Sequence, residues 1–163
     1  MSKAVLISIR PKWCELIASG QKTVEVRKTR PKMLAPFKVY IYETRGNELF
    51  GNETYHSVKK GNGRGMVIGE FVCRNIFPLS FYASEASFFD TVPPMNVPET
   101  CLTDKEIVEY LGNGKTGYGW LISDLVIYDE PKGLREFYRW NGWYHEQMER
   151  PPQSWCYVEE KTE

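Results

Sequence analysis

The sequence lacks long apolar segments, and this bounds where the protein can reside. The apolar run near the N-terminus, residues 4–9, is too short for a signal peptide, and no cleavage-type site follows it. No stretch approaches the roughly 18 apolar residues that are needed to span a bilayer. We therefore expect a cytoplasmic protein with no membrane partner.

The sequence also lacks clustered metal-binding residues. It contains four widely spaced cysteines with no CxxC pair, at positions 14, 73, 101 and 156. Its two histidines, His56 and His145, are far apart in the chain. Metal sites draw on clusters of such residues, and scattered cysteines in a cytosolic protein are typically reduced and packed. We expect no metal site and no organic cofactor.

An excess of charge of one sign is absent as well. The chain has 21 Lys and Arg residues against 21 Asp and Glu residues, so its formal net charge is zero. This argues against a protein held on nucleic acid mainly by bulk electrostatics. Basic residues are nevertheless concentrated locally, because residues 22–38 contain six of them and one acidic residue, Glu25.

Several strands, few helices and turn-rich connections are what the pattern of the 163 residues predicts. Thr103 begins a capping-box sequence that indicates a helix. Glycine-rich residues 44–65 indicate a long loop, and residues 77–100 an irregular segment. The expected strands cover residues 4–9, 23–28, 38–43, 66–76, 117–129 and 154–158. The fold class expected is α+β, a small β-barrel with a few short helices covering it.

The charged strand near the N-terminus is the main candidate site. In a regular strand Thr23, Glu25 and Arg27 share one face, while Val24 and Val26 pack on the other. Two interpretations stay open at this point. The strand can be solvated, with surface ion pairs of little energetic value. It can equally line a cleft, where desolvated charges bind a ligand or perform chemistry.

The same stretch carries a family resemblance. Gly20-x-Lys22-x-x-Glu25-x-Arg27 resembles the GxKxxExR signature of the ASCH domain family, whose fold is PUA-like. Val67–Val72 and Gly119–Asp124 resemble later strands of the family. The resemblance spans about residues 4–130. We expect one ASCH/PUA-like domain over residues 1–163, with 131–163 as a C-terminal extension packed on the core.

The resemblance implies two classes of activity. Most members of the family are RNA-binding modules, and some small bacterial members resemble amidohydrolases acting on N4-acylated cytidine. In that branch a Lys, a Thr and a later Glu form the catalytic set. Lys22 and Glu70 match the Lys and the later Glu. The position of the Thr is occupied by Glu25, so the hydroxyl of that branch is not in its usual place.

These arguments define the candidate residues and partners. The candidate catalytic residues are Lys22, Glu25 and Glu70, where a carboxylate could act as general base and Lys22 could stabilise an oxyanion. The expected partner is RNA or a modified nucleoside. A ribonuclease, or a protein-interaction module using the aromatic C-terminal segment, remains a further alternative. The candidate ligand-binding residues are Lys22, Thr23, Glu25, Arg27, Lys28, Lys59, Lys60 and Arg64.

Aromatic side chains offer a further means of binding RNA. Tyr118, Trp120 and Trp155 could stack on unpaired bases, as aromatic residues do in single-strand binding proteins. They could also be core residues of strands, which are rich in aromatic side chains. Both interpretations are open from the sequence.

Overall fold

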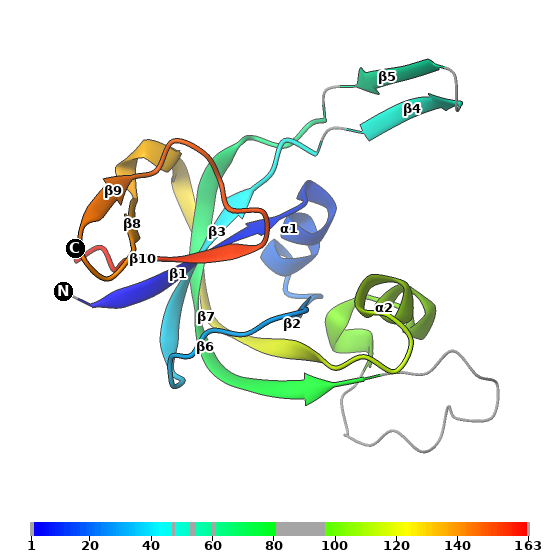
Figure 1. The fold of residues 1–163 in the computed structure, drawn as a ribbon, viewed down its shortest axis with the longest axis horizontal. Helices are drawn as coiled ribbons and strands as arrows, with labels where there is room; N and C mark the ends of the chain where they lie inside the picture. Colours follow the sequence, from blue (N-terminus) through cyan, green and yellow to red (C-terminus); the bar gives the residue numbers. More distant parts are fainter. Residues whose placement is uncertain (1, 47, 53–54, 60, 81–96, 163) are drawn as a thin grey trace. The chain divides into compact units, whose positions relative to one another are not determined.

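The computed structural model describes residues 2–46, 48–52, 55–59, 61–80 and 97–162, with backbone alone for 48–52, 55–59, 97 and 98 (Figure 1). In chain order the elements are β1 (Lys3–Ile9), α1 (Pro11–Ala18), β2 (Val24–Arg27), β3 (Phe37–Glu43), β4 (Glu48–Asn52), β5 (Tyr55–Lys59), β6 (Met66–Leu79), the 3₁₀ turn η1 (Val97–Thr100), α2 (Asp104–Leu111), β7 (Gly117–Lys132), the 3₁₀ turn η2 (Leu134–Glu136), β8 (Tyr138–Trp140), β9 (His145–Gln147) and β10 (Trp155–Glu159).

The chain divides into two compact units, which we call unit one and unit two. Unit one comprises residues 1–15, 38–71 and 126–163, and unit two comprises residues 16–37 and 72–125. The long strands β6 and β7 contribute to both units.

Strand β1 is the centre of unit one. Its residues from Ala4 to Ile9 are all buried, as expected for an apolar run covered on both faces. It pairs in parallel with β3 on one side and antiparallel with β10 on the other. The hydroxyl of Ser8 donates a hydrogen bond to the carbonyl of Pro152 at 2.7 Å. The C-terminal segment is thereby fixed to the first strand of the chain.

The core of unit one combines residues that lie far apart in the sequence. Its buried cluster consists of Ala4, Leu6, Tyr40, Tyr42, Val67, Phe137, Met148 and Val158. Because three of these residues follow residue 130, the last part of the chain is integral to the core of this unit.

Unit two places strand β2 against β7. The two strands are antiparallel, with Val24 opposite Leu121 and Arg27 opposite Tyr118. Helix α2 begins at the capping box that the sequence predicts, since the Thr103 side chain accepts from the backbone N–H of Glu106 and Glu106 caps in return. Its buried residues Ile107 and Leu111 pack against this part of the sheet. The cluster they form includes Val26 and Leu79.

The sheet-rich architecture with two α-helices agrees with the predicted α+β class. The predicted closure of the sheet into a barrel is not confirmed. Among the described strands, the hydrogen-bonded order is β2-β7-β6-β3-β1-β10-β8-β9, and it ends at β2 and β9 without joining them. Neither α-helix of the described residues is long and apolar enough to cross a membrane.

Two stretches differ from the expectations. The prediction of a loop over residues 44–65 is wrong in its centre, because β4 and β5 pair there as an antiparallel hairpin. The many glycines of this stretch favour the prediction of a loop over that of two short strands. The predicted irregular segment over residues 77–100 lies mostly outside the described residues, although β6 continues to Leu79.

Candidate functional site

The end of helix α1 and the start of β2 position the first candidate residue, Lys22. Helix α1 is followed by a left-handed glycine, Gly20, with φ of 80°, whose N–H donates to the carbonyl of Ile17. The N–H of Lys22 then donates to the carbonyl of Leu16 at 3.0 Å. The N–H of Thr23 donates to the carbonyl of Glu99 at 2.9 Å. The backbone on both sides of the Lys22 side chain is therefore fixed.

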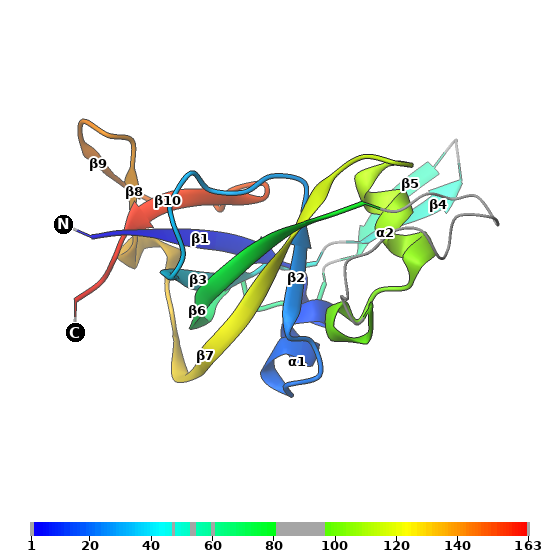
Figure 2. The same ribbon diagram turned by 90° about the horizontal axis from the view of Figure 1, so that it is seen from below.

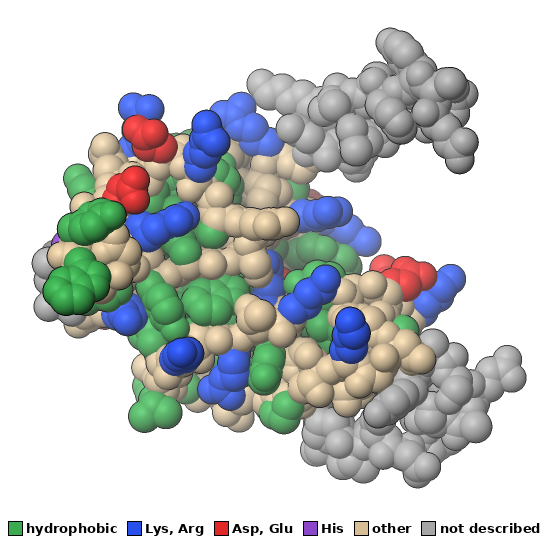
Figure 3. Space-filling model, in the orientation of Figure 1, with side chains coloured by type: hydrophobic (Ala, Val, Ile, Leu, Met, Phe, Trp, Pro, Cys, Tyr) green, Lys and Arg blue, Asp and Glu red, His purple; other side chains and the backbone are tan. Residues whose placement is uncertain are grey.

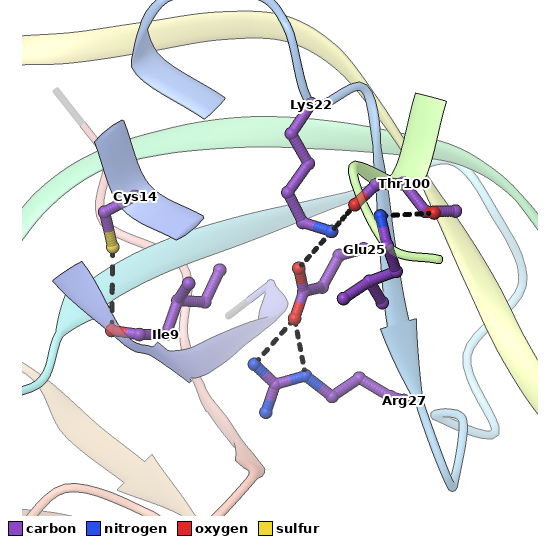
Figure 4. A network of polar contacts seen from close by, with 7 residues as sticks. Ile9, Cys14, Lys22, Glu25, Arg27 and Thr100 are labelled. Carbon is purple, nitrogen blue, oxygen red and sulfur yellow. Dashed lines mark hydrogen bonds and ion pairs between the residues drawn. The ribbon is translucent and has the colours of Figure 1, made fainter. Parts of the chain in front are cut away.

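The side chains of Lys22, Glu25 and Arg27 form one ionic network (Figure 4). The ammonium of Lys22 lies 3.4 Å from Glu25 Oε2 and donates a hydrogen bond to the carbonyl of Thr100 at 2.6 Å. Arg27 approaches the other carboxylate oxygen, with Nε 3.0 Å and Nη2 2.9 Å from Oε1. One carboxylate is thus shared by two cations.

This network is buried. The exposed fractions are 2% for Lys22, 5% for Glu25 and 8% for Arg27. All four residues of β2 are buried, so both faces of this strand are covered. The interpretation as a solvated strand with surface ion pairs is therefore wrong. The valines lie on one buried face of the strand and the charged residues on the other.

Two cations share one carboxylate within the network. Lys22 and Arg27 also have further interactions besides this carboxylate. Glu25 Oε2 accepts no hydrogen bond from the described residues, although the Lys22 ammonium lies near it. Taking charges out of water is costly unless they are paired, and buried ionic groups occur both in structural networks and at functional sites.

Exposed cations continue from this network along the chain. Lys28 and Arg30 are exposed, and each lies over an aromatic ring. The Lys28 ammonium is 5.2 Å from the ring centroid of Tyr110, and the Arg30 guanidinium is 5.8 Å from that of Tyr118. The backbone N–H of Lys28 also donates to the Tyr110 hydroxyl. Burial raises the pKa of Tyr110, while the positive charge of Arg27 opposes that rise.

Glu70 lies on β6 in unit one, where it has other partners. It pairs with the ammonium of Lys38 at 3.2 Å and accepts a hydrogen bond from the Tyr128 hydroxyl. Lys38 in turn contacts Glu160 at 3.7 Å. Burial lowers the pKa of Lys38, but the hydrogen bond and charge of Glu70, together with Tyr40 and Glu160, outweigh it, so the pKa is raised. The catalytic role of Glu70 stays a prediction.

The remaining candidates lie in different surroundings. Thr23 is half-buried beside Lys22. Arg64 is exposed in unit one, and its backbone N–H donates to the Glu43 carboxylate at 2.8 Å. The side chain of Lys59 and the whole of Lys60 lie outside the described residues. Their part in ligand binding stays a prediction.

The stacking hypothesis is wrong for Trp120. This side chain is fully buried, with an exposed fraction of 0%, and packs edge-on against Phe37 with ring centroids 6.1 Å apart. Tyr118 is half-buried under Arg30, and Trp155 is half-buried beside Tyr157. Among the described residues, no group of three or more His, Cys, Asp or Glu side chains could hold a metal ion.

Two residues of the site, Thr100 and Tyr110, could not be predicted from the sequence. Thr100 contacts Lys22 through its backbone carbonyl, which any residue type could supply. Tyr110 lies on the apolar stripe of α2, and that pattern indicates packing rather than a contact with a cation. Only the tertiary structure brings these two residues to the charged strand.

Comparison with known proteins agrees with this architecture. A family model described as the ASCH domain matches residues 7–158. The crystal structure of ASCH from Zymomonas mobilis superposes with a TM-score of 0.59 at 21% identity, covering 96% of this chain and 87% of that chain. Two single-substitution variants of that protein each give a TM-score of 0.61, at 20% and 19% identity. They cover 97% and 96% of this chain, and 91% and 88% of theirs.

At these identities the structural likeness concerns the fold. No match was found among the curated proteins. The family match extends to residue 158. The resemblance found in the sequence extends only to about residue 130.

Proposed function

The chain belongs to the ASCH domain family, and from this premise we propose that it binds RNA in the cytoplasm through unit two. The binding surface consists of Lys28 and Arg30 with the tyrosine rings beneath them. The buried network of Lys22, Glu25 and Arg27 stabilises the strand that leads to this surface. RNA association is a general property of the family.

The observation that carries the proposal is the run of cations from the buried network to the surface. Lys22 and Arg27 share one carboxylate, and the exposed cations at positions 28 and 30 follow directly. Phosphate groups are the anions that RNA offers to such a surface.

The aromatic rings give the surface a second property. Tyr110 and Tyr118 each lie beneath a cation and remain partly accessible. Unpaired bases stack on aromatic rings and on guanidinium planes, whereas the deep major groove of duplex RNA does not admit side chains. The surface therefore suits single-stranded RNA.

The test is the salt dependence of RNA binding. A labelled single-stranded RNA is titrated with the protein at several salt concentrations, and the slope of log affinity against log salt is measured. The double variant Lys28→Ala/Arg30→Ala should bind more weakly. Its slope should fall by about 0.7 for each phosphate that the variant no longer neutralises. The RNA is recovered intact if the activity is binding rather than cleavage.

Lys12→Ala/Lys105→Ala is the matched control, because it also removes two exposed cations. Lys105 lies on α2 in unit two and pairs only loosely with Glu109, at 3.9 Å. The control should keep both the affinity and the slope of the unaltered protein. Equal losses in the two double variants would show that the protein binds through diffuse charge and would contradict the proposed surface.

A second candidate function is hydrolysis of N4-acylated cytidine. The observation in its favour is the position of the Lys22 ammonium, which a carbonyl and a carboxylate hold in place. Water would attack the acyl carbon, the bond from that carbon to N4 would break, and cytidine and a carboxylate would be released. Glu25 would accept a proton from the water and pass it to N4 as the carbon–nitrogen bond breaks, and Lys22 would stabilise the oxyanion.

The hydrolase branch of the family uses a threonine hydroxyl, and Glu25 occupies that position in this chain. Thr100 lies beside Lys22, but its carbonyl faces the ammonium and its Oγ1 accepts from the N–H of Leu102 at 3.1 Å. The test is release of cytidine from N4-acetylcytidine, with Lys22→Met beside the Lys105→Met control. Turnover that disappears only in Lys22→Met would support the hydrolase.

A further inference from the structure

Hairpin β8–β9 in unit one exposes two large aromatic side chains. Its turn is formed by residues 141–144, and the exposed fractions are 94% for Trp143 and 65% for Tyr144. Figure 2 shows the hairpin extending away from strands β1 and β10 of the same unit. Tyr138, at the start of the hairpin, is 41% exposed.

The turn holds these side chains outward. The Asn141 Oδ1 atom accepts hydrogen bonds from the backbone N–H groups of Trp143 at 3.0 Å and Tyr144 at 2.9 Å. Gly142 takes a positive φ of 94°, which the tight turn requires. This local hydrogen bonding fixes the backbone before any ligand arrives, so little conformational entropy would be lost on binding.

The strand residues that flank the turn are also held in place. The rings of Trp140 and His145 meet edge-on with centroids 5.0 Å apart, and these residues are cross-strand partners. His145 Nδ1 pairs with the carboxylate of Glu159 on β10. The exposed aromatics are thus carried by an anchored element.

Cations lie among the aromatic rings of this region. The Lys3 ammonium is 4.5 Å from the ring centroid of Tyr157 and 5.7 Å from that of Trp140. Arg139, on β8, is exposed. In Figure 3 hydrophobic side chains stand at the surface on the left edge, where Figure 1 places this hairpin, with Lys and Arg side chains nearby.

The kinds of residue exposed distinguish between possible ligands. The large apolar side chains that the hairpin exposes are all aromatic, namely Tyr138, Trp143 and Tyr144. Beside these rings β9 presents the polar residues His145, Glu146 and Gln147, whereas the core of a protein interface is richer in apolar area than the rest of the surface. Pairing of β9 with a second copy, centred on its middle residue, would place two Glu146 carboxylates opposite each other.

We propose that Trp143 and Tyr144 stack on unpaired bases of single-stranded RNA. Exposed flat rings on an element that also carries a cation, here Arg139, are the combination that single-strand binding proteins use. The inference rests on the proposed function, because it concerns the same RNA. It adds a contact in unit one that depends on stacking rather than on charge.

The test compares affinity with its salt dependence in the full-length protein. Trp143→Ala should bind a single-stranded oligonucleotide about tenfold more weakly. The slope against salt should stay unchanged, because the same phosphates remain neutralised. Trp143→Phe keeps a ring and should recover most of the affinity. RNA should quench the indole fluorescence of the unaltered protein more than that of Trp143→Phe.

Leu34→Ala is the matched control, since Leu34 is an 88% exposed large apolar residue without a ring. It should bind like the unaltered protein. Unchanged affinity in both Trp143→Ala and Tyr144→Ala would overturn the inference, as would a loss that Trp143→Phe does not recover. If Lys28→Ala/Arg30→Ala still lowers the slope in that case, the proposed function stands without this contact.

Discussion

The Lys22 ammonium donates a hydrogen bond to the backbone carbonyl of Thr100 at 2.6 Å, across 78 positions of the sequence. This contact joins the charged strand to the turn η1, and the Thr23 N–H donates to the neighbouring carbonyl of Glu99. The pair of contacts holds the lysine against Glu25. The position of the Lys22 ammonium is therefore set by η1, which is remote in the sequence from the family signature.

Glu25→Gln should be strongly destabilising. The change leaves Lys22 and Arg27 buried beside a neutral amide, so two cations lose their shared counter-ion. Loss of one partner from a buried ionic group typically costs about 3–5 kcal/mol of the free energy of unfolding. Urea denaturation measures this loss.

Lys22→Met should lower the free energy of unfolding by less than Glu25→Gln does, because Arg27 still neutralises the carboxylate.

The control for Glu25→Gln is Glu109→Gln, whose side chain is 65% exposed and pairs with Lys105. A surface pair of this kind contributes about 0–1 kcal/mol. Equal effects of Glu25→Gln and Glu109→Gln would contradict the network as a stabilising element.

Gly69→Ala should destabilise unit one. A Cβ atom at this position would lie 2.4 Å from the Val126 carbonyl oxygen and 3.1 Å from the Ile127 Cα atom. Because the obstacle is backbone, it cannot rotate away, and the expected loss is about 3 kcal/mol, at the upper end for overpacking. The midpoint of urea unfolding reports it.

Gly133→Ala is the matched substitution. Gly133 has φ of −69°, and the nearest atom to its added Cβ is 3.7 Å away, an ordinary contact. It should leave stability unchanged or raise it by about 0.5 kcal/mol. A similar loss in both variants would show that the packing at Gly69 is not tight in solution.

The protein should lose stability as the pH becomes alkaline. Burial raises the pKa of the Cys73 thiol from an ordinary value of 9.0 to about 11, and burial also raises the pKa of Cys156, Tyr40 and Tyr110. A raised pKa contributes stability that is fully present below the unfolded value and is lost as the pH rises through the folded value. The free energy of unfolding should therefore fall between about pH 9 and pH 11.

Cys73→Ala isolates one contributor to this pH dependence. Its free energy of unfolding should decline less steeply over the same pH range, whatever its stability at neutral pH. Parallel pH profiles for the two proteins would assign the alkaline loss to other groups. At pH 8, a thiol reagent should modify Cys73 only after unfolding, since the thiolate is the reactive form.

Truncation after residue 130 should abolish folding of unit one. It removes β10, whose residues pair with β1 at five positions, and three core side chains, Phe137, Met148 and Val158. The shortened chain should show no cooperative unfolding transition by circular dichroism. Deletion of residues 161–163 is the control, because β10 remains. A chain of residues 1–130 that unfolds cooperatively would contradict this account.

The sequence alone determined the local structure and the family. The strand at residues 4–9, the glycine stop at Gly20 and the capping box at Thr103 depend on neighbouring residues, and all three are present. The short strands β4, β5, β8 and β9 were not predicted, because a three- to five-residue strand among glycines and polar residues has too few positions to show alternation.

The tertiary structure decided whether the charged strand is buried and which residues surround it. Alternation along β2 shows that two faces differ, but it cannot show that both are covered. That depends on segments far away in the chain, such as η1, which supplies the Thr100 carbonyl, and α2, which supplies Tyr110. A backbone carbonyl has no signature in the sequence, so only folding could reveal the partner of Lys22.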